Sequence, residues 1–156
     1  MKAPVKMMVR SLALCSLLAV AGNAFGADKV CKVEITGTDA MQYDKKELSV
    51  AADCTQVEVT LHHSGKLPAQ AMGHNWVLAK TADVAGIASD GIGAGFANDH
   101  IKPGDARVIA HTKIIGGGQS TSVTFPLSKL KAGESYTYFC SFPGHSAIMK
   151  GTFKIG

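Results

Sequence analysis

The residues best suited to metal or catalytic chemistry lie on one short segment near the C-terminus, YFCSFPGHSAIMKG, at residues 138–151. This segment carries a thiol at Cys140, an imidazole at His145 and a thioether at Met149. All three are soft or borderline metal ligands, and the Pro-Gly pair between the first two predicts a rigid turn that can point them at one centre. The spacing therefore predicts a metal site that takes a further ligand from another part of the chain.

His74, in the segment AMGHNW, is the candidate for that further ligand. It directly precedes a strand-like run that begins at Asn75 and Trp76, and such a position in a β-sandwich can lie at the same end as the C-terminal segment. Two histidines, one thiolate and one weak thioether form the ligand set of a trigonal copper site that transfers electrons. The residues thus favour an electron-transfer centre.

Other chemistries use part of the same set. A buried cysteine taken alone is usually a small hydrophobe. A Cys-His hydrolase would use Cys140 as its nucleophile and His145 or His74 as its base, but it leaves Met149 without a role. Structural zinc sites seldom include methionine and usually contain more thiolates. The four residues together favour copper over these alternatives.

The first 26 residues have the pattern of a secretory signal peptide. Three basic residues come first, an apolar run spans residues 11–21, and Ala24-Phe25-Gly26 places small residues at a cleavage spacing. The run is shorter than the roughly 20 residues that a membrane span requires. Leu14 is not the small residue expected before a lipid-bearing cysteine, so we expect no lipidation at Cys15. We predict removal of residues 1–26 and a periplasmic single domain at residues 27–156.

The charge of the remaining chain is close to zero. Three of the 16 basic residues lie in the first 26, which leaves 13 basic against 12 acidic residues and changes the net charge from +4 to +1. No polybasic run remains, so we expect no nucleic-acid partner.

Three cysteines follow the signal segment, and an oxidising compartment predicts that two of them pair. Cys31 and Cys54 both lie near the N-terminus, so their pairing is the economical one. The closed loop of about 24 residues would stabilise the fold by about 3 kcal/mol. Cys140 is then the free thiol.

Alternation of β-branched or aromatic residues with polar ones dominates the chain and predicts short strands separated by turns. About eight strands in a domain of this size indicate an all-β, Greek-key β-sandwich or barrel. The predicted strands are residues 30–35, 46–50, 56–61, 75–80, 106–111, 121–127, 135–140 and 151–155.

Residues 81–100 break this alternation. Val84, Ile87 and Ala88 have helical spacing, but four glycines interrupt the segment, so we expect a short helix and a flap outside the sheets. The glycine run at residues 116–118 predicts a mobile hairpin turn.

With these motifs in view, the chain resembles the azurins, the bacterial blue copper proteins of the cupredoxin family. The resemblance rests on the Cys-x4-His-x3-Met segment, on LPAQAMGHNWVL at residues 67–78 and on RVIAHTK at residues 107–113, and it extends along residues 27–156. It implies a cupredoxin fold, one type 1 copper ion and a non-enzymatic carrier of single electrons. A copper-handling or copper-storage protein with the same ligands is the alternative.

The resemblance also implies a role for each site residue. The implied copper ligands are His74, Cys140 and His145, the weak axial thioether of Met149 and, on the opposite side, the backbone carbonyl of Gly73. Asn75 and Ser141 correspond to positions whose hydrogen bonds tie the two ligand segments together. His63 corresponds to a position whose protonation is linked to redox state, although its sequence context alone indicates a hydrogen-bonded structural histidine.

An apolar docking patch around the edge of His145 is implied as well. Exposed apolar patches mark interaction sites, and small contacts suit transient redox encounters. We expect a monomer that meets redox proteins such as c-type cytochromes or periplasmic reductases. The expected members of the patch are Met41, Leu67, Ala71, Met72, Phe142, Ala147 and Ile148. His111 is expected on a surface strand, and Ile92 replaces a methionine frequent in the family.

Overall fold

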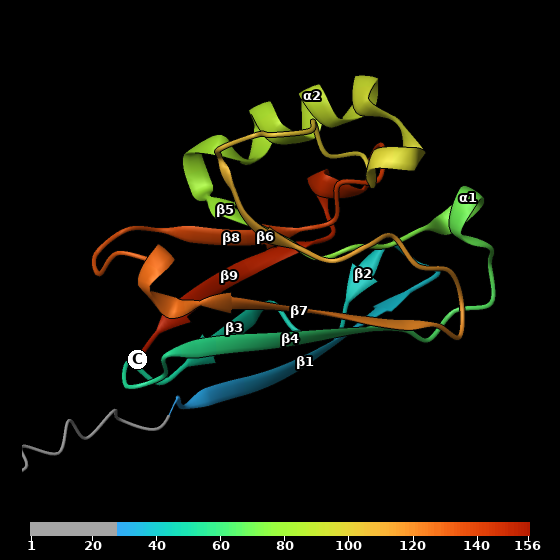
Figure 1. Ribbon diagram of the computed structural model, residues 1–156. Helices are drawn as coiled ribbons and strands as arrows, with labels where there is room; N and C mark the ends of the chain where they lie inside the picture. The colour runs from blue at the N-terminus through green and yellow to red at the C-terminus, as the bar shows by residue number, and fades with distance from the viewer. Residues whose placement is uncertain (1–27) are drawn as a thin grey trace, which may run out of the picture.

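The computed structural model describes residues 28–156, so the predicted signal peptide at residues 1–26 lies outside the described part of the chain. Residues 28–156 form two packed β-sheets with a helix on the outside (Figure 1). The strands are β1 (Val30–Thr38), β2 (Gln42–Tyr43), β3 (Glu47–Val50), β4 (Gln56–His63), β5 (Val77–Lys80), β6 (Val108–His111), β7 (Ser120–Pro126), β8 (Tyr136–Phe139) and β9 (Lys150–Ile155).

One sheet has the strand order β2-β1-β4-β7 and the other has the order β3-β9-β8-β5-β6. β1 pairs with β4 in parallel, and β3 pairs with β9 in parallel, whereas β8 is antiparallel to both of its neighbours. Parallel neighbours require the chain to cross over between pairings, which interleaves the two sheets. The predicted β-sandwich is confirmed, as are its eight strands. β2 was not predicted because two residues are too short to show alternation.

The core between the sheets is formed by alternate residues of each strand, because successive side chains of a strand point to opposite faces. Val57, Val59 and Leu61 on β4 are fully buried, while the residues between them face outward. Trp76 fills the centre and stacks on Phe125, with ring centroids 6.1 Å apart. Each such buried side chain stabilises the fold by roughly 1.5–3 kcal/mol. This packing makes the sandwich a firm support for residues at its ends.

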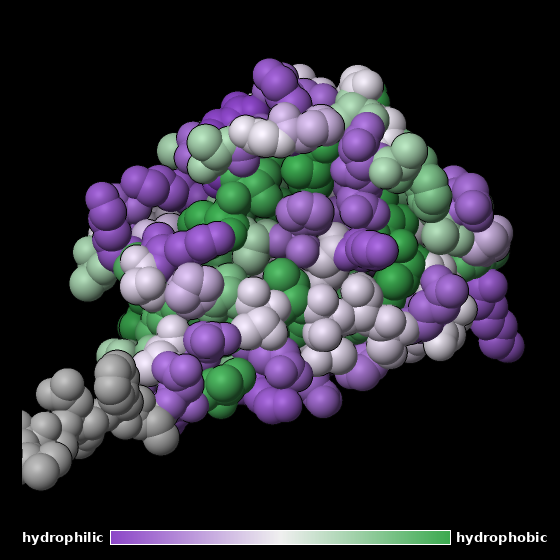
Figure 2. Space-filling view, viewed as in Figure 1, coloured by the Kyte–Doolittle hydropathy of each residue, from purple (hydrophilic) through white to green (hydrophobic). Residues whose placement is uncertain are grey.

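The segment at residues 81–100 lies outside the sheets, as predicted. It contains a 3-10 turn (Thr81–Asp83), α2 (Val84–Ala94) and a second 3-10 turn (Phe96–Asn98). α2 covers the outer face of the five-stranded sheet, and Figure 2 shows apolar atoms gathered beneath it. Val84 and Ile87 pack there against residues of β5 and β8. Gly91 lies within the helix at a position that requires glycine, because a Cβ there would collide with the carbonyl oxygen of His100.

The glycine run Gly116–Gly118 is not a hairpin turn, so that prediction is wrong. It connects β6 in one sheet to β7 in the other. The amides of Gly117 and Gly118 donate to the carbonyls of Leu67 and His63 at 2.9 and 2.8 Å. A Cβ at the first two glycines would collide with neighbouring backbone. The glycines therefore serve close packing against the segment that leads to α1 (Ala69–Met72).

Cys31 and Cys54 form a disulfide with a Cα–Cα distance of 5.8 Å, which confirms the predicted pairing. The bridge joins the start of β1 to the segment before β4, at the end of the sandwich opposite α1 (Figure 1). Among residues 28–156, Cys140 is the free cysteine, and it is buried. No helix in this described range is long and apolar enough to cross a membrane.

Replacement of both bridged cysteines, Cys31→Ser with Cys54→Ser, should lower the free energy of unfolding by about 3 kcal/mol, because the unfolded chain gains the freedom of a 23-residue separation. Urea unfolding of protein that lacks residues 1–26 measures this loss. Titration of the unfolded, metal-free protein without residues 1–26 should find one reactive thiol per chain. Three reactive thiols would contradict the bridge in the secreted protein.

Candidate metal centre

Three predicted ligands meet at one end of the sandwich. The ligand atoms of His74, Cys140 and His145 all lie within 4.8 Å of one another. Sγ of Cys140 is 3.9 Å from Nδ1 of His74 and 3.6 Å from Nδ1 of His145. The three side chains are 0, 0 and 3% exposed, so the cluster is shielded from water. The arrangement suits one metal ion held by two nitrogens and one sulfur.

The pairing of β5 with β8 explains why residues far apart in sequence meet here. His74 lies just before β5, and Cys140 lies just after β8. The two strands are antiparallel, with Val77 opposite Phe139, so the start of one and the end of the other share an edge. A two-sided backbone bridge between His74 and Ile115 holds the first segment in place.

The loop after Cys140 folds back on itself and returns Met149 to the site. Gly144 adopts φ of 84°, a left-handed conformation that glycine enters at little cost. The amide of Met149 then donates to the carbonyl of His145 at 2.8 Å, and the amide of Cys140 donates to the carbonyl of Met149 at 3.0 Å. Met149 is fully buried in the same core cluster as Cys140. The loop thus delivers a thioether as well as an imidazole.

Asn75 and Ser141 tie the two ligand segments together. The Ser141 amide donates to Oδ1 of Asn75 at 2.9 Å, and Nδ2 of Asn75 donates to the Ser141 hydroxyl at 2.8 Å. The same hydroxyl donates to the carbonyl of Asp99 at 2.8 Å. Asn75 and Ser141 are both buried, so no water competes for these bonds. They fix His74 relative to Cys140.

The protonation states of the cluster suit metal ligation. Nε2 of His74 donates to the carbonyl of Thr38 at 2.8 Å, which leaves the lone pair of Nδ1 facing Cys140. Burial lowers the pKa of His74 and lowers the pKa of His145 to about 4, so both imidazoles are neutral near pH 7. Burial also raises the pKa of Cys140 to about 12. A bound cation is what favours the thiolate in this environment.

The donor set fits copper better than zinc. Besides two imidazoles and one thiol, the site offers the thioether of Met149 and the carbonyl oxygen of Gly73, which lies 3.8 Å from Sγ of Cys140. Trigonal copper sites combine two histidines and one cysteine with weak axial ligands of these kinds. Structural zinc sites are tetrahedral and rely on thiolates and imidazoles alone.

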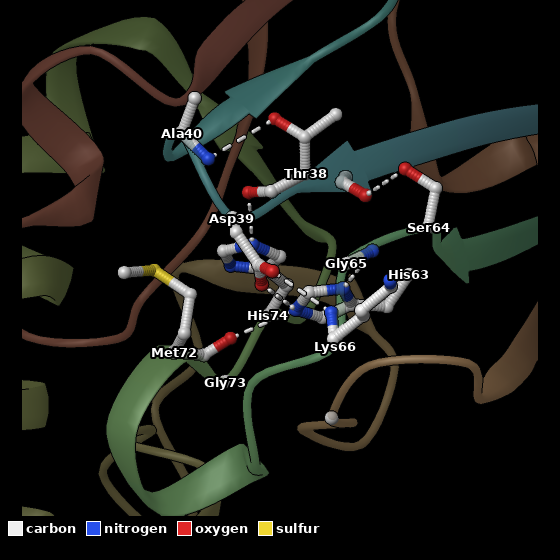
Figure 3. A network of polar contacts seen from close by, with 12 residues as sticks. Thr38, Asp39, Ala40, His63, Ser64, Gly65, Lys66, Met72, Gly73 and His74 are labelled. Carbon is white, nitrogen blue, oxygen red and sulfur yellow. Dashed lines mark hydrogen bonds and ion pairs between the residues drawn. The ribbon is translucent and has the colours of Figure 1, made fainter.

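His63 backs the ligand His74 (Figure 3). The two rings stack with centroids 4.3 Å apart. Nε2 of His63 donates to the carbonyl of Met72 at 2.9 Å, and Nδ1 accepts from the Gly65 amide at 3.0 Å. Both ring nitrogens of His63 are therefore hydrogen-bonded, and the ring is held in a fixed position against the ring of His74. Redox-linked protonation of His63 stays a prediction.

Sequence reasoning missed two contributors to the site. Thr38 acts through its backbone carbonyl, which no residue type signals. The buried hydroxyl of Tyr43 donates to the carbonyl of Asn75, and β2, which carries it, was not predicted. His111, which was expected on a surface strand, is the last residue of β6 and is half-buried.

The residues of the expected docking patch lie on segments that flank the ligands. Leu67 and Ile148 are 42% and 51% exposed, Ala71 and Ala147 are exposed, and Met41, Met72 and Phe142 are half-buried. The ring of Phe142 packs against that of His145, with centroids 4.7 Å apart. Phe142 thus packs directly against the buried ligand candidate His145.

Comparison with known proteins agrees with this geometry. The model of the copper binding proteins of the plastocyanin/azurin family matches residues 29–156. The chain belongs to this family. Copper is accordingly the cofactor of the site, and His74, Cys140, His145 and Met149 are its candidate ligands.

Individual relatives are azurins. The azurin of Bordetella pertussis is 59% identical over 125 residues, which cover 80% of this chain and 83% of that protein. The azurin of Pseudomonas aeruginosa is 50% identical over 148 residues, which cover 95% and 99%. The solved azurin Az-iso2 from Methylomonas sp. strain J superposes with a TM-score of 0.79 at 50% identity, over 81% of this chain and 98% of that one.

Asn75→Ala should lower the free energy of unfolding by about 3 kcal/mol, because it leaves the buried amide of Ser141 without a partner and removes the bond that the Ser141 hydroxyl accepts. Urea unfolding of the metal-free protein measures the loss. Asn98→Ala is the matched control, since Asn98 makes one exposed hydrogen bond at the end of α2. Equal losses in the two variants would contradict the role of Asn75.

Proposed function

We propose that this protein is a periplasmic electron carrier that passes single electrons between redox proteins and catalyses no reaction of its own. One observation carries the proposal: two neutral imidazoles, a buried thiol and a buried thioether converge at one end of a rigid β-sandwich. Bound copper supplies a one-electron couple between Cu(II) and Cu(I). Membership of the plastocyanin/azurin family supports the same conclusion.

The residues around the site favour rapid transfer by keeping the ligands still. The Asn75–Ser141 bonds and the Thr38–His74 bond hold ligand segments that come from opposite parts of the chain. Two imidazoles, a thiolate and a weak thioether are acceptable to both oxidation states of copper. Little movement of these side chains is then needed when the charge of the site changes.

The observed burial argues against a Cys-His hydrolase. Cys140 is fully buried, so a substrate carbonyl has no access to its sulfur. The pKa of the thiol, raised to about 12 by burial, is also opposite to that of an activated nucleophile. Copper storage with the same ligands remains the alternative function. Reversible redox cycling, which storage does not require, separates the two.

The docking patch, made of Met41, Leu67, Ala71, Met72, Phe142, Ala147 and Ile148, supports transient partners. None of its seven members is charged, so complexes through it depend on a small apolar contact that separates quickly. Redox proteins such as c-type cytochromes or periplasmic reductases suit this surface, and we propose a monomer in solution. The periplasmic location rests on the predicted signal peptide.

Cys140→Ser should eliminate the intense blue absorption band that appears when Cu(II) is added to the wild type, because that band requires a copper–thiolate bond. The absorption spectrum after Cu(II) addition measures it, and far-UV circular dichroism checks that the sandwich persists. Retention of the band in the variant would contradict the copper–thiolate assignment.

Met72→Lys should slow electron self-exchange while leaving the blue band unchanged. Two molecules that meet through the docking patch would bring like charges together, and the cost is largest at low ionic strength, where screening is weakest. NMR line broadening in mixed Cu(I)/Cu(II) samples measures the rate. Ala132→Lys adds the same charge before β8, at the end far from Cys140, and should leave the rate unchanged. An unchanged rate in Met72→Lys would mean that electrons enter elsewhere.

A further inference from the structure

A glycine occupies an inward-facing position of β1 next to the metal centre. Alternation along this strand turns Val33, Ile35 and Gly37 toward the core, and both Ile35 and Gly37 are buried. An apolar side chain is expected at such a position. Glycine inside a strand weakens it and often marks a place where another group approaches closely. The glycine at position 37 therefore suggests that another group lies too close to the strand for a side chain to fit.

Two candidate copper ligands occupy the space that a side chain at this position would fill. A Cβ built on Gly37 would lie 2.8 Å from Cδ2 of His74 and 2.9 Å from Cε of Met149. Favourable carbon–carbon contacts lie at about 3.5–4.0 Å, so both distances are too short for an added methyl group. The absence of a side chain at Gly37 thus leaves room for the parts of both ligand side chains that face it.

The backbone of Gly37 cannot move away to make room. It pairs with Tyr43 on β2 and with His63 on β4. Its carbonyl also accepts a hydrogen bond from the Ser64 amide at 2.9 Å. These contacts hold the strand on both edges.

The two ligands differ in their freedom to respond. The ring of His74 is fixed by its bond to the Thr38 carbonyl at 2.8 Å and by stacking on His63. Met149 has three rotatable side-chain bonds, and the atom in contact is its terminal methyl group. A methyl group at position 37 would therefore displace mainly the thioether of Met149.

We propose that Gly37 is a positioning residue that sets the placement of the Met149 thioether and, through it, the reduction potential of the site. This inference rests on the proposed electron-transfer function. A side chain at position 37 would meet carbon atoms of the ligands and not their donor atoms, so this position acts on the potential through the placement of Met149.

The test is a double-mutant cycle on the copper-loaded protein. Gly37→Ala should keep the blue band and raise the reduction potential, because a displaced thioether donates less to Cu(II). Met149→Leu should raise the potential too, and Gly37→Ala added to Met149→Leu should shift it no further. Gly93→Ala is the matched control, since a Cβ there meets no atom within 4 Å, and its potential should equal that of the wild type. Equal shifts in both backgrounds, or no shift from Gly37→Ala, would overturn the proposal.

Unfolding of the metal-free variants gives a second readout. Gly37→Ala should lower the unfolding midpoint more in the wild type than in Met149→Leu, because leucine lacks the terminal methyl group that the new Cβ would meet. If Gly37→Ala yields no folded protein, recovery of folding in the Met149→Leu background supports the proposal and a failure to recover overturns it. A wild type without the blue band would instead overturn the proposed function itself.

Discussion

The antiparallel pairing of β5 with β8 is the interaction on which the metal centre depends. It places the residue before β5 beside the residue after β8, and so it brings His74 to Cys140 across more than sixty positions of sequence. The Asn75–Ser141 bonds continue this pairing beyond the last ladder residues. Because the strands are packed into the sandwich core, the ligand geometry inherits the rigidity of the fold.

The second property of the site is its burial from water, which destabilises the metal-free protein. Burial holds the Cys140 thiol protonated and keeps both imidazoles neutral, and Sγ of Cys140 makes only long contacts with Nδ1 of His74 and of His145, at 3.9 and 3.6 Å. A bound cation offsets this cost by favouring the thiolate. The family to which the chain belongs is one of copper binding proteins, and the donor set explains why copper suits it.

The two ends of the sandwich differ: one holds the candidate metal centre and the other holds the disulfide. The candidate copper ligands, the proposed docking patch and Gly37 lie at one end, while the Cys31–Cys54 bridge closes the other. A bridge far from the ligands restricts the unfolded chain without introducing a reactive sulfur near the centre. α2 adds an outer layer over the five-stranded sheet and shields β5 and β8, the strands next to His74 and Cys140.

Much of this protein could be predicted from its sequence, because soft ligands at Cys140, His145 and Met149 have few shared uses and because alternation reports burial residue by residue. The Cys31–Cys54 disulfide was predicted because two of the three cysteines after residue 26 should pair, and these two both lie near the N-terminus. The hairpin at residues 116–118 was predicted wrongly because glycine signals a turn and close packing alike. Only the tertiary structure decided the roles of Thr38, Tyr43 and Gly37, since a backbone carbonyl, a two-residue strand and a missing side chain act through neighbours that are distant in sequence.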